Sequence, residues 1–474
     1  MQRLRRIYLL LLSGFLLTLV ASCKKDQATI QTLPFPQPVG TGVTVTLHPE
    51  SAGSKIPESF LGFSYEISAL TDSSFLSVND AVLLQLYKNL GNGYIRVGGN
   101  SSDELVWTGG PRTSGTGKDS LTTTDIDGFS AFARATGWPV LFGLNLGEYN
   151  VSKAVNEAGY VAGSLQGSLS AFQIGNEADL FHDNGLRASS YNYAEFRQEW
   201  ENYFNAVRAV QPSAPFAGPD VADNQAWIDS FSMEEHTKVG LIDGHFYRAG
   251  PASSPSIVYQ TILAPDAGLT TYLTTFLNES ESYSLGFRIS ECNSVYDGGK
   301  TGVSNVFASA LWALDYMWTV ASARGQGINF HGGTGGAYSP VVRSSGVWSA
   351  RPEYYAMLAF KEGAQGSLVP ADAGFGSLNA SAYASINNGI EFLTLINKDV
   401  QPIAFTVLPG INASQVQVMR LTAPSYTDQD SVSFSNAQVD AGGNFTPGTP
   451  ENYGGGSSFI VNVPAGNAAV VIIR

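Results

Sequence analysis

From about residue 60 the chain alternates between short apolar runs and longer stretches with a helical period. The apolar runs have the length of strands, and there are eight of them: residues 60–66, 94–98, 140–146, 172–177, 215–219, 241–247, 285–291 and 327–331. Between them apolar residues recur every three or four positions, as in amphipathic helices, for example at 80–90, 127–136, 193–210 and 303–323. Nearly continuous apolar strands that alternate with helices are typical of a parallel sheet buried on both faces. Because eight such units close a barrel, we predict an α/β fold with a (β/α)8 TIM barrel over residues 56–355.

The pattern changes after residue 355, where the helical period disappears. Runs that alternate apolar and polar residues follow at 391–396, 415–421, 458–463 and 468–473, separated by turns of Gly, Asn and Pro. These features predict a β-sandwich over residues 356–474. Residues 43–47 alternate in the same way, so segment 43–55 is predicted to supply the first strand of this sandwich. Both ends of the mature chain would then form one domain beside the barrel. The alternative for the central region, a doubly wound sheet, seldom has eight units.

The N-terminus has the features of a secretion signal. Three arginines among the first six residues precede an apolar run of 14 residues, which is too short to span a bilayer. The run ends in Val-Ala-Ser-Cys, which resembles the bacterial lipobox, so residues 1–22 are predicted to be a lipoprotein signal peptide and Cys23 the lipidated residue. The alternative is ordinary cleavage after a small residue. Residues 23–42, rich in Pro, Gln, Thr and Gly, are predicted to be a tether. The expected location is therefore the periplasm or surface of a bacterium, as a membrane-anchored lipoprotein.

Charge and cysteine content narrow the classes of partner. The formal net charge is −14, and loss of the arginines of the signal would make the mature chain more negative still. Such a charge argues against nucleic acid and against polybasic docking on a membrane, which leaves the lipid anchor as the only expected membrane contact. The two cysteines are Cys23 and Cys292, so a lipidated Cys23 leaves no intramolecular disulfide. Cys292 is predicted to be a packed thiol that faces the helix layer.

Besides the first, two of the predicted strands end in glutamate. The run Ala-Phe-Gln-Ile-Gly-Asn-Glu ends at Glu177 after the fourth strand, and Leu-Gly-Phe-Arg-Ile-Ser-Glu ends at Glu291 after the seventh. The carboxyl ends of all strands open on one face of a closed barrel, so these side chains can converge there. Two carboxyls about 5–5.5 Å apart are what a retaining glycosidase needs. We predict Glu177 as the acid/base and Glu291 as the nucleophile; the alternative is that each is a solvated glutamate at a strand end.

The sequence around these residues resembles the retaining glycoside hydrolases of clan A, and within the clan it is most similar to family 79, which contains bacterial β-glucuronidases and heparanase. The matching motifs lie at residues 60–66, 95–100, 173–177, 245–247 and 289–293. The resemblance covers nearly the whole mature chain and includes a sandwich built from both termini. Family 51 arabinofuranosidases share the barrel, the sandwich and a Gly-Asn-Glu acid/base.

The resemblance implies roles for further residues at the same face of the barrel. Asn176 would hydrogen-bond the 2-hydroxyl of the sugar, or serve only as a turn residue. Arg96 would keep Glu291 ionised through its charge, although a purely structural ion pair is an alternative. Glu66 and Asn100 would line the floor of the sugar site, whereas a glutamate on the first strand could equally cap a loop.

A uronate needs local donors on a chain with so negative a charge. The sequence has no arginine cluster after strands six to eight, but it has Tyr247, Tyr296, His331 and Tyr338, together with backbone amides around Ala337. Family 79 β-glucuronidases use tyrosines and backbone amides at matching places, so the resemblance implies that these groups bind the substrate. The alternative is that Tyr247 orients Glu291 and the others pack.

These features predict a retaining exo-β-glucuronidase with a glucuronic-acid-containing carbohydrate as its partner. The glycine-rich segment 332–336 lacks the Lys-Ser/Thr of a phosphate loop, and none of the five histidines has the spacing of a metal site, so no cofactor and no metal are expected. The alternatives are a clan A exo-glycosidase that acts on a neutral sugar, such as an arabinofuranosidase, or a surface glycan-binding protein without activity.

Overall fold

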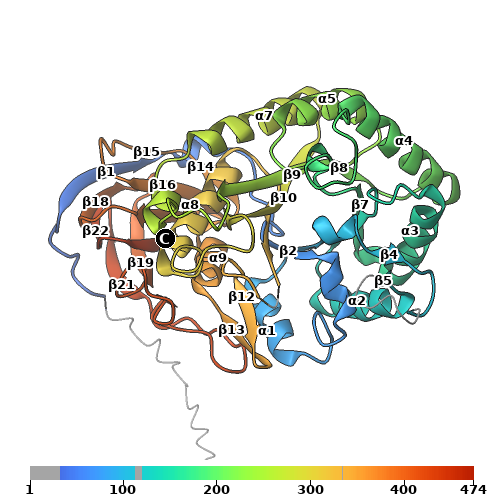
Figure 1. The fold of residues 1–474 in the computed structure, drawn as a ribbon. Helices are drawn as coiled ribbons and strands as arrows, with labels where there is room; N and C mark the ends of the chain where they lie inside the picture. The colour runs from blue at the N-terminus through green and yellow to red at the C-terminus, as the bar shows by residue number, and fades with distance from the viewer. Residues whose placement is uncertain (1–31, 113–119, 334) are drawn as a thin grey trace, which may run out of the picture.

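The computed structural model describes residues 32–112, 120–333 and 335–474. The predicted signal peptide, Cys23 and residues 23–31 of the predicted tether lie outside the described residues. In the described part, a barrel surrounded by helices lies beside a domain of strands (Figure 1). The strand nearest the N-terminus, drawn in blue, lies among red strands from the end of the chain (Figure 1).

The barrel is formed by eight parallel strands of the described chain, in the order β7-β6-β3-β2-β11-β10-β9-β8. A β-bridge between Phe172 and Phe216 and a 2.8 Å bond from the Glu177 amide to the Asp220 carbonyl join the first and last strands of this order, so the sheet is closed. The predicted TIM barrel is confirmed. The strands are β2 (Gly62–Glu66), β3 (Tyr94–Gly98), β6 (Val140–Leu144), β7 (Leu169–Ile174), β8 (Ala217–Val221), β9 (Leu241–Ala249), β10 (Gly286–Val295) and β11 (Ile328–Gly332).

A helix follows each barrel strand and covers the barrel from outside. The helices are α1 (Ala81–Leu90), α2 (Thr123–Thr136), α3 (Val151–Leu165), α4 (Tyr193–Val210), α5 (Gln225–Glu235), α7 (Ala267–Tyr283), α8 (Phe307–Ser322) and α9 (Pro352–Gly363), with the short α6 (Tyr259–Leu263) before α7. Capping boxes fix where two of them begin: Thr122 with Asp125 at α2, and Asn192 with Glu195 at α4. Helix α9 runs through the boundary that the sequence predicts at residue 355. The eighth β/α unit therefore ends at Gly363.

Three strand ends differ from their predicted positions and affect the site. Strand β7 ends at Ile174 because Gly175 has a φ of 79°, so Glu177 lies in the following loop rather than on the strand. Strand β8 begins and ends two residues later than predicted. Strand β10 continues to Val295, which places Glu291 inside the strand, because polar residues of its second half are buried in the barrel instead of marking its end.

The remaining strands form a sandwich of two sheets, ordered β15-β1-β18-β22 and β14-β16-β17-β23-β19-β20, with β21 paired to β19. The early strand β1 pairs with β15 and β18, which confirms that both ends of the folded chain build one domain. The outer face of the larger sheet packs on α8 and α9, where Trp318 stacks on Tyr383 with ring centroids 5.5 Å apart. The strands are β1 (Thr41–Leu47), β14 (Ser367–Val369), β15 (Ala371–Ala373), β16 (Ala380–Asn387), β17 (Ile390–Asn397), β18 (Ile403–Leu408), β19 (Ala413–Thr422), β20 (Ser433–Phe434), β21 (Glu451–Gly456), β22 (Phe459–Val463) and β23 (Asn467–Ile473).

Short elements complete the loops between the barrel strands. Two small sheets pair β4 (Val106–Trp107) with β5 (Ser120–Leu121), and β12 (Val341–Ser344) with β13 (Val347–Ala350). The short 3-10 helices are η1 (Pro49–Ser51), η2 (Ile67–Thr71), η3 (Asn100–Ser102), η4 (Gln166–Ser168) and η5 (Ala178–Leu180). Within the ranges that the structure describes, no helix is both long and apolar enough to cross a membrane.

Candidate active site

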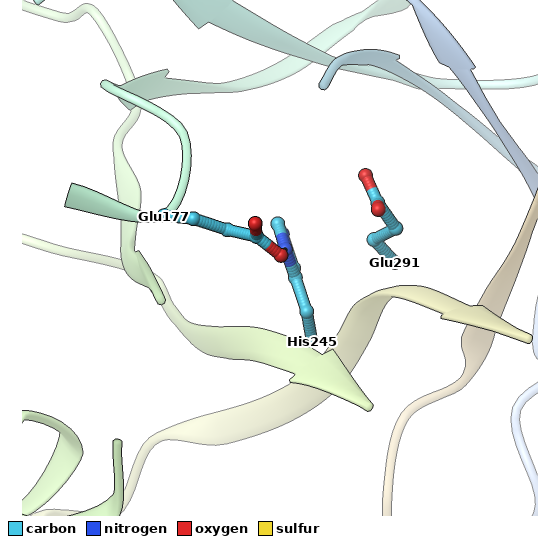
Figure 2. Close-up of side chains that lie close together, drawn as sticks. All are labelled: Glu177, His245 and Glu291. Atoms are coloured by element: carbon cyan, nitrogen blue, oxygen red, sulfur yellow. The ribbon is translucent and has the colours of Figure 1, made fainter. Parts of the chain in front are cut away.

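Glu177 and Glu291 face each other at the carboxyl ends of the barrel strands, with His245 of β9 beside Glu177 (Figure 2). One carboxyl oxygen of each glutamate and a ring nitrogen of His245 all lie within 4.8 Å of one another. The separation of the two glutamates is close to the distance of about 5–5.5 Å that a retaining glycosidase needs. The two glutamates predicted from distant parts of the chain are therefore brought together.

A β-bulge in β10 aims the nucleophile candidate into the barrel. The pairing of β10 with β9 shifts by one residue between Ile289 and Glu291, so the extra residue, Ser290, has no partner in the ladder. Both Ser290 and Glu291 then face the interior, where the Ser290 hydroxyl donates to Asp220 at 2.9 Å. Cys292 faces the helix layer and lies against α8, which agrees with its predicted packed position.

A second bulge, in β8, brings Asp220 into the same interior. The pairing of β8 with β9 shifts between Pro219 and Val221, and the extra residue Asp220 has a φ of 56°. Glu177, whose amide bonds to the Asp220 carbonyl, has a φ of 50°. Two left-handed residues other than glycine, bonded to each other, indicate a site where the fold holds strained backbone in place.

Arg96 on β3 connects the groups of the site. Its Nη1 donates to Glu291 at 2.5 Å, and its Nη2 donates to Asp220 at 2.6 Å and to the side-chain oxygen of Asn176 at 2.7 Å. Its Nε donates to Gln173 at 3.2 Å. Burial of this guanidinium would lower its pKa, but the charges of Asp220 and Glu291 raise the pKa above its ordinary value. The site therefore contains a permanent, fully buried cation.

Glu291 is held as a carboxylate. It accepts hydrogen bonds from the Tyr247 hydroxyl at 2.7 Å and from Arg96, and the Nδ1 of His331 lies 3.2 Å from its second oxygen. Burial would raise the pKa of this carboxyl, but the charges of His331, His245 and Arg96 hold the pKa well below its ordinary value. An ionised carboxylate fixed at both oxygens has the properties of a glycosidase nucleophile.

His245 lies between two carboxyl groups. Its Nδ1 is 2.8 Å from Oε1 of Glu177, and its Nε2 is 2.8 Å from Oδ1 of Asp220. Burial would lower the pKa of this imidazole, but Asp220, Glu291 and the two hydrogen bonds raise the pKa well above its ordinary value. Glu177 itself is partly exposed to solvent and lies farther from Arg96, so it has a different environment from Glu291.

Two further buried acids support the loops and strands of the site. Asp103 accepts the backbone amides of Leu146, Gly147 and Asn176 at 2.8–2.9 Å, which fixes the turn that precedes Glu177. Burial raises the pKa of Asp103 to about 7.

The second acid, Asp243, lies below the site on β9. It accepts from the side chain of Gln173 at 2.7 Å and from the Asp220 amide at 3.0 Å. Burial and the neighbouring Asp220 raise the pKa of Asp243 to about 8. Asp220 and Glu291, whose pKa values are lowered, therefore face Arg96 and His245, whose pKa values are raised.

Glu66 and Asn100 lie at the rim of this site. The Asn176 amide donates to Asn100 at 3.0 Å, and Glu66 accepts the Ser101 amide at 2.9 Å. The Nε2 of His331 is 3.9 Å from the free oxygen of Glu66. Glu66 thus caps the loop after β3 and also approaches His331, and its part in the sugar site stays a prediction.

The tyrosines lie together, but one predicted donor is already occupied. Tyr296 is 42% exposed and packs edge-on against Tyr247, and the ring of Tyr338 lies 6.2 Å from that of Tyr247. The Ala337 amide donates to the Gly298 carbonyl at 2.6 Å. The Ala337 amide is therefore occupied, because it holds two loops together, and binding of the substrate by the other amides around Ala337 stays a prediction.

The structure brings together every residue predicted for the site. These are Glu66, Arg96, Asn100, Asn176, Glu177, Tyr247, Glu291, Tyr296, His331 and Tyr338. Tyr247 and His331, predicted to bind substrate, lie against the nucleophile candidate, which fits the alternative that Tyr247 orients Glu291.

Sequence reasoning assigned no role to Asp220, His245, Gln173 or Asp243. His245 has the same strand parity as Tyr247, two residues away, which is a signal that could have placed it in the interior. Gln173 and Asp243 interrupt otherwise apolar runs, and a polar residue in a buried strand indicates a partner inside the barrel. Asp220 gave no such signal, because the bulge that turns it inward changes the parity of the strand.

The three groups in Figure 2 also have the residue types of a metal site. A transition metal requires ligand atoms about 2.0–2.2 Å from the ion. Here both nitrogens of His245 face carboxyl oxygens, and Glu291 is paired with Arg96 at 2.5 Å. A cation would compete with two positive side chains, so these residues fit two-carboxyl chemistry better than a metal. The expectation of no metal and no cofactor stays a prediction.

Comparisons with known proteins place the chain among glycosidases. No protein-family model matches it. A β-glucuronidase of Aspergillus niger is 24% identical over 362 residues, which cover 66% of this chain and 66% of that protein. A β-glucuronidase of Neurospora crassa is 25% identical over 373 residues, covering 67% and 65%. The chain resembles glycoside hydrolase family 79 of clan A. The match spans about two thirds of the length of these family 79 relatives.

Solved structures share the fold of this family 79-like chain. A 4-O-α-L-rhamnosyl-β-D-glucuronidase of Fusarium oxysporum superposes with a TM-score of 0.73 at 19% identity and covers 93% of this chain and 100% of its own. A family 51 arabinofuranosidase of Xanthomonas axonopodis superposes with a TM-score of 0.66 at 16% identity, covering 92% and 100%. Both likenesses extend over the barrel and the sandwich, and they concern the fold alone.

Proposed function

We propose that the protein is a retaining exo-β-glucuronidase in which Glu291 is the nucleophile and Glu177 the acid/base. The observation that carries the proposal is the pair of carboxyls within 4.8 Å in unequal surroundings. Glu291 is enclosed by Arg96 and His331, which favour the charged form that attacks. Glu177 has one oxygen bonded to His245 and the other without a partner among the described residues. The free oxygen can carry a proton toward a leaving group.

The reaction then follows in two displacements. In the first, a carboxylate oxygen of Glu291 bonds to the anomeric carbon, the bond to the aglycone oxygen breaks, and Glu177 gives its proton to that oxygen. In the second, Glu177 takes a proton from water, the water oxygen bonds to the anomeric carbon, and Glu291 leaves as a carboxylate. Asn176, held by Arg96 and Asn100, is placed to bond the 2-hydroxyl of the sugar.

The glucuronide specificity is supported by the groups around the nucleophile and by the names of the two fungal relatives. The rings of Tyr296 and Tyr338 both pack against that of Tyr247, and neither hydroxyl is bonded to Glu291. The pKa of His331 is raised above its ordinary value, because the charge and hydrogen bond of Glu291 outweigh the effect of burial. Hydroxyl donors and an imidazole suit a C6 carboxylate on a chain whose net charge is negative.

Aryl glycosides test this specificity. We expect an aryl β-glucuronide to be hydrolysed at least about a hundredfold more efficiently than the matching β-glucoside, because a glucoside leaves buried donors unpaired at about 1–3 kcal/mol each. Tyr296→Phe or Tyr338→Phe should lower the ratio of kcat/KM for the glucuronide to kcat/KM for the glucoside. Tyr149→Phe, at an exposed tyrosine whose hydroxyl bonds Asn202, is the matched control and should leave the ratio unchanged. Equal rates on both glycosides, or a preference for an arabinofuranoside, would show that the substrate is a neutral sugar and not a uronate.

We further propose that the protein is exported and anchored through a lipid on Cys23, supported by the Val-Ala-Ser-Cys motif after a short apolar run. The intact mass of the exported protein should correspond to a chain that begins at Cys23 with added acyl groups. Cys23→Ser should remove the acyl mass. An unmodified N-terminus elsewhere in the wild-type protein would exclude the anchor.

A further inference from the structure

The acid/base candidate has a fixed partner that the two-carboxyl mechanism does not require. His245 bonds Glu177 on one ring nitrogen and Asp220 on the other, each at 2.8 Å. Both carboxyl oxygens accept hydrogen bonds, so the geometry accommodates a proton on each nitrogen of the ring. Asp220 in turn accepts from Arg96 and Ser290, which keeps its carboxylate ionised and in place.

The backbone fixes the same three residues. Glu177 and Asp220 both have left-handed φ angles, and the amide of Glu177 bonds the carbonyl of Asp220 at 2.8 Å where the barrel closes. The acid/base is thus attached to Asp220 twice, once through the main chain and once through His245. Strained backbone at two residues other than glycine that lie side by side in the fold persists only where the surrounding structure holds both residues in place.

We propose that His245, held as an imidazolium by Asp220, is a positioning residue that confines the acid proton of Glu177 to Oε2. Oε1 is occupied as an acceptor by the Nδ1–H of His245, so the proton resides on the oxygen that has no partner among the described residues. That oxygen is free to face the glycosidic oxygen. When Glu177 gives up its proton, the same hydrogen bond stabilises the new carboxylate, and His245 keeps both of its protons throughout. The inference rests on the proposed role of Glu177.

The charges around His245 come from every side of the barrel. Asp220 on β8, Glu177 after β7, Glu291 on β10 and Asp243 on its own strand are acids, with Asp179 of η5 beyond Glu177, whereas Arg96 on β3 has a nitrogen 3.4 Å from Nε2. Burial would lower the pKa of His245, but the charges of Asp220 and Glu291 and the hydrogen bonds to Asp220 and Glu177 raise it well above its ordinary value. The imidazolium should therefore persist through neutral pH.

Two substitutions test the two ring nitrogens of His245 separately. An asparagine at 245 can place its amide near Nδ1 and donate to Glu177, whereas a glutamine reaches toward Asp220 and leaves Glu177 without its donor. kcat/KM is measured for two glycosides of whichever sugar the wild-type enzyme hydrolyses, one with a phenyl and one with a 2,4-dinitrophenyl leaving group. The dinitrophenolate departs without a proton, so only the phenyl glycoside depends on acid catalysis.

We expect His245→Gln to lower kcat/KM about a hundredfold on the phenyl glycoside and less than about threefold on the dinitrophenyl glycoside, in the range of a single general-acid contribution. His245→Asn should recover at least about tenfold of the loss. His236→Asn, at the end of α5 outside the barrel, is the matched control and should change neither value. Equal losses on both glycosides, or no loss, would overturn the proposal. If the proposed sugar is wrong, the wild-type enzyme will prefer another glycoside, and this result leaves the test of His245 unaffected.

A spectroscopic readout is independent of turnover. The chain has five histidines, so nitrogen-15 labelling of histidine gives few signals, and the one missing from His245→Asn identifies His245. In the free enzyme at neutral pH we expect both ring nitrogens of His245 to carry protons. Asp220→Asn should convert the ring to the neutral form. A neutral imidazole in the wild-type enzyme at neutral pH would overturn the role of Asp220.

Discussion

Glu291→Ala and Glu177→Ala are each expected to lower kcat/KM on a substrate with a poor leaving group by about 10^4-fold, equivalent to about 5.4 kcal/mol of transition-state stabilisation. The first variant has no group to attack the anomeric carbon, and the second has no proton donor. The loss in Glu177→Ala should be much smaller on a dinitrophenyl glycoside, because this leaving group needs no proton for the first displacement. Steady-state kinetics on the two substrates measures both effects.

Azide distinguishes the two roles by stereochemistry. In Glu177→Ala, azide replaces the water that the base would activate, attacks the glycosyl-enzyme and gives a β-glycosyl azide. In Glu291→Ala, azide replaces the nucleophile itself, attacks the β-glycoside from the opposite face and gives an α-glycosyl azide. Glu66→Ala, at a carboxylate on the same face, should not be rescued by azide. Identical products from the two variants, or reversed products, would show that the roles are assigned wrongly.

The barrel and the facing pair of glutamates could be predicted because their signals are local. Each strand is an apolar run, and Glu177 and Glu291 follow such runs at the same end of the barrel. The strand ends were less accurate, since Glu291 lies inside β10 and Glu177 lies beyond β7. Strand β7 ends early because Gly175 has a positive φ, whereas β10 continues past Glu291 because its polar residues are buried and paired within the barrel.

The supporting network could not be predicted, because it depends on irregular backbone. Asp220 and Ser290 turn inward through bulges in β8 and β10, where the parity of the strand changes. No periodicity in the sequence marks a bulge. The Ala337 amide could not be excluded as a donor either, because its bond to Gly298 joins two loops that are close only in the folded chain.

The network gives the two carboxyls of one barrel different surroundings. Arg96 and His331 lie against Glu291, whereas among the described residues the carboxyl of Glu177 bonds only to His245. His245 and Arg96 share the carboxylate of Asp220, so this single acid orients a partner of each of the two glutamates. Removal of one charge from this network should therefore affect the fold as well as the reaction.

Arg96→Met is expected to lower the free energy of unfolding by about 3–5 kcal/mol at neutral pH, because it leaves Asp220 and Glu291 as buried carboxylates without their cation. In the wild-type protein the pKa values of both acids are lower than in the unfolded chain. Their ionisation therefore stabilises the fold at pH values above the ordinary carboxyl pKa, and this stabilisation is lost as the pH falls through the lowered pKa values. Without Arg96, burial raises these pKa values. The deficit of the variant should then be larger at about pH 8 than at about pH 5. Urea unfolding of both proteins at the two pH values measures it.

Arg288→Met is the matched control, because Arg288 is also fully buried in the barrel but donates to backbone carbonyls and to Asn329 rather than to a carboxylate. Burial lowers the pKa of Arg288 to about 9, so its charge does not change between about pH 5 and pH 8 in either the folded or the unfolded chain. Its loss should therefore cost the same stability at both pH values. If Arg96→Met shows the same pH-independent deficit as Arg288→Met, the carboxylates are not held ionised by Arg96, and the charged state of Glu291 depends on the two histidines alone.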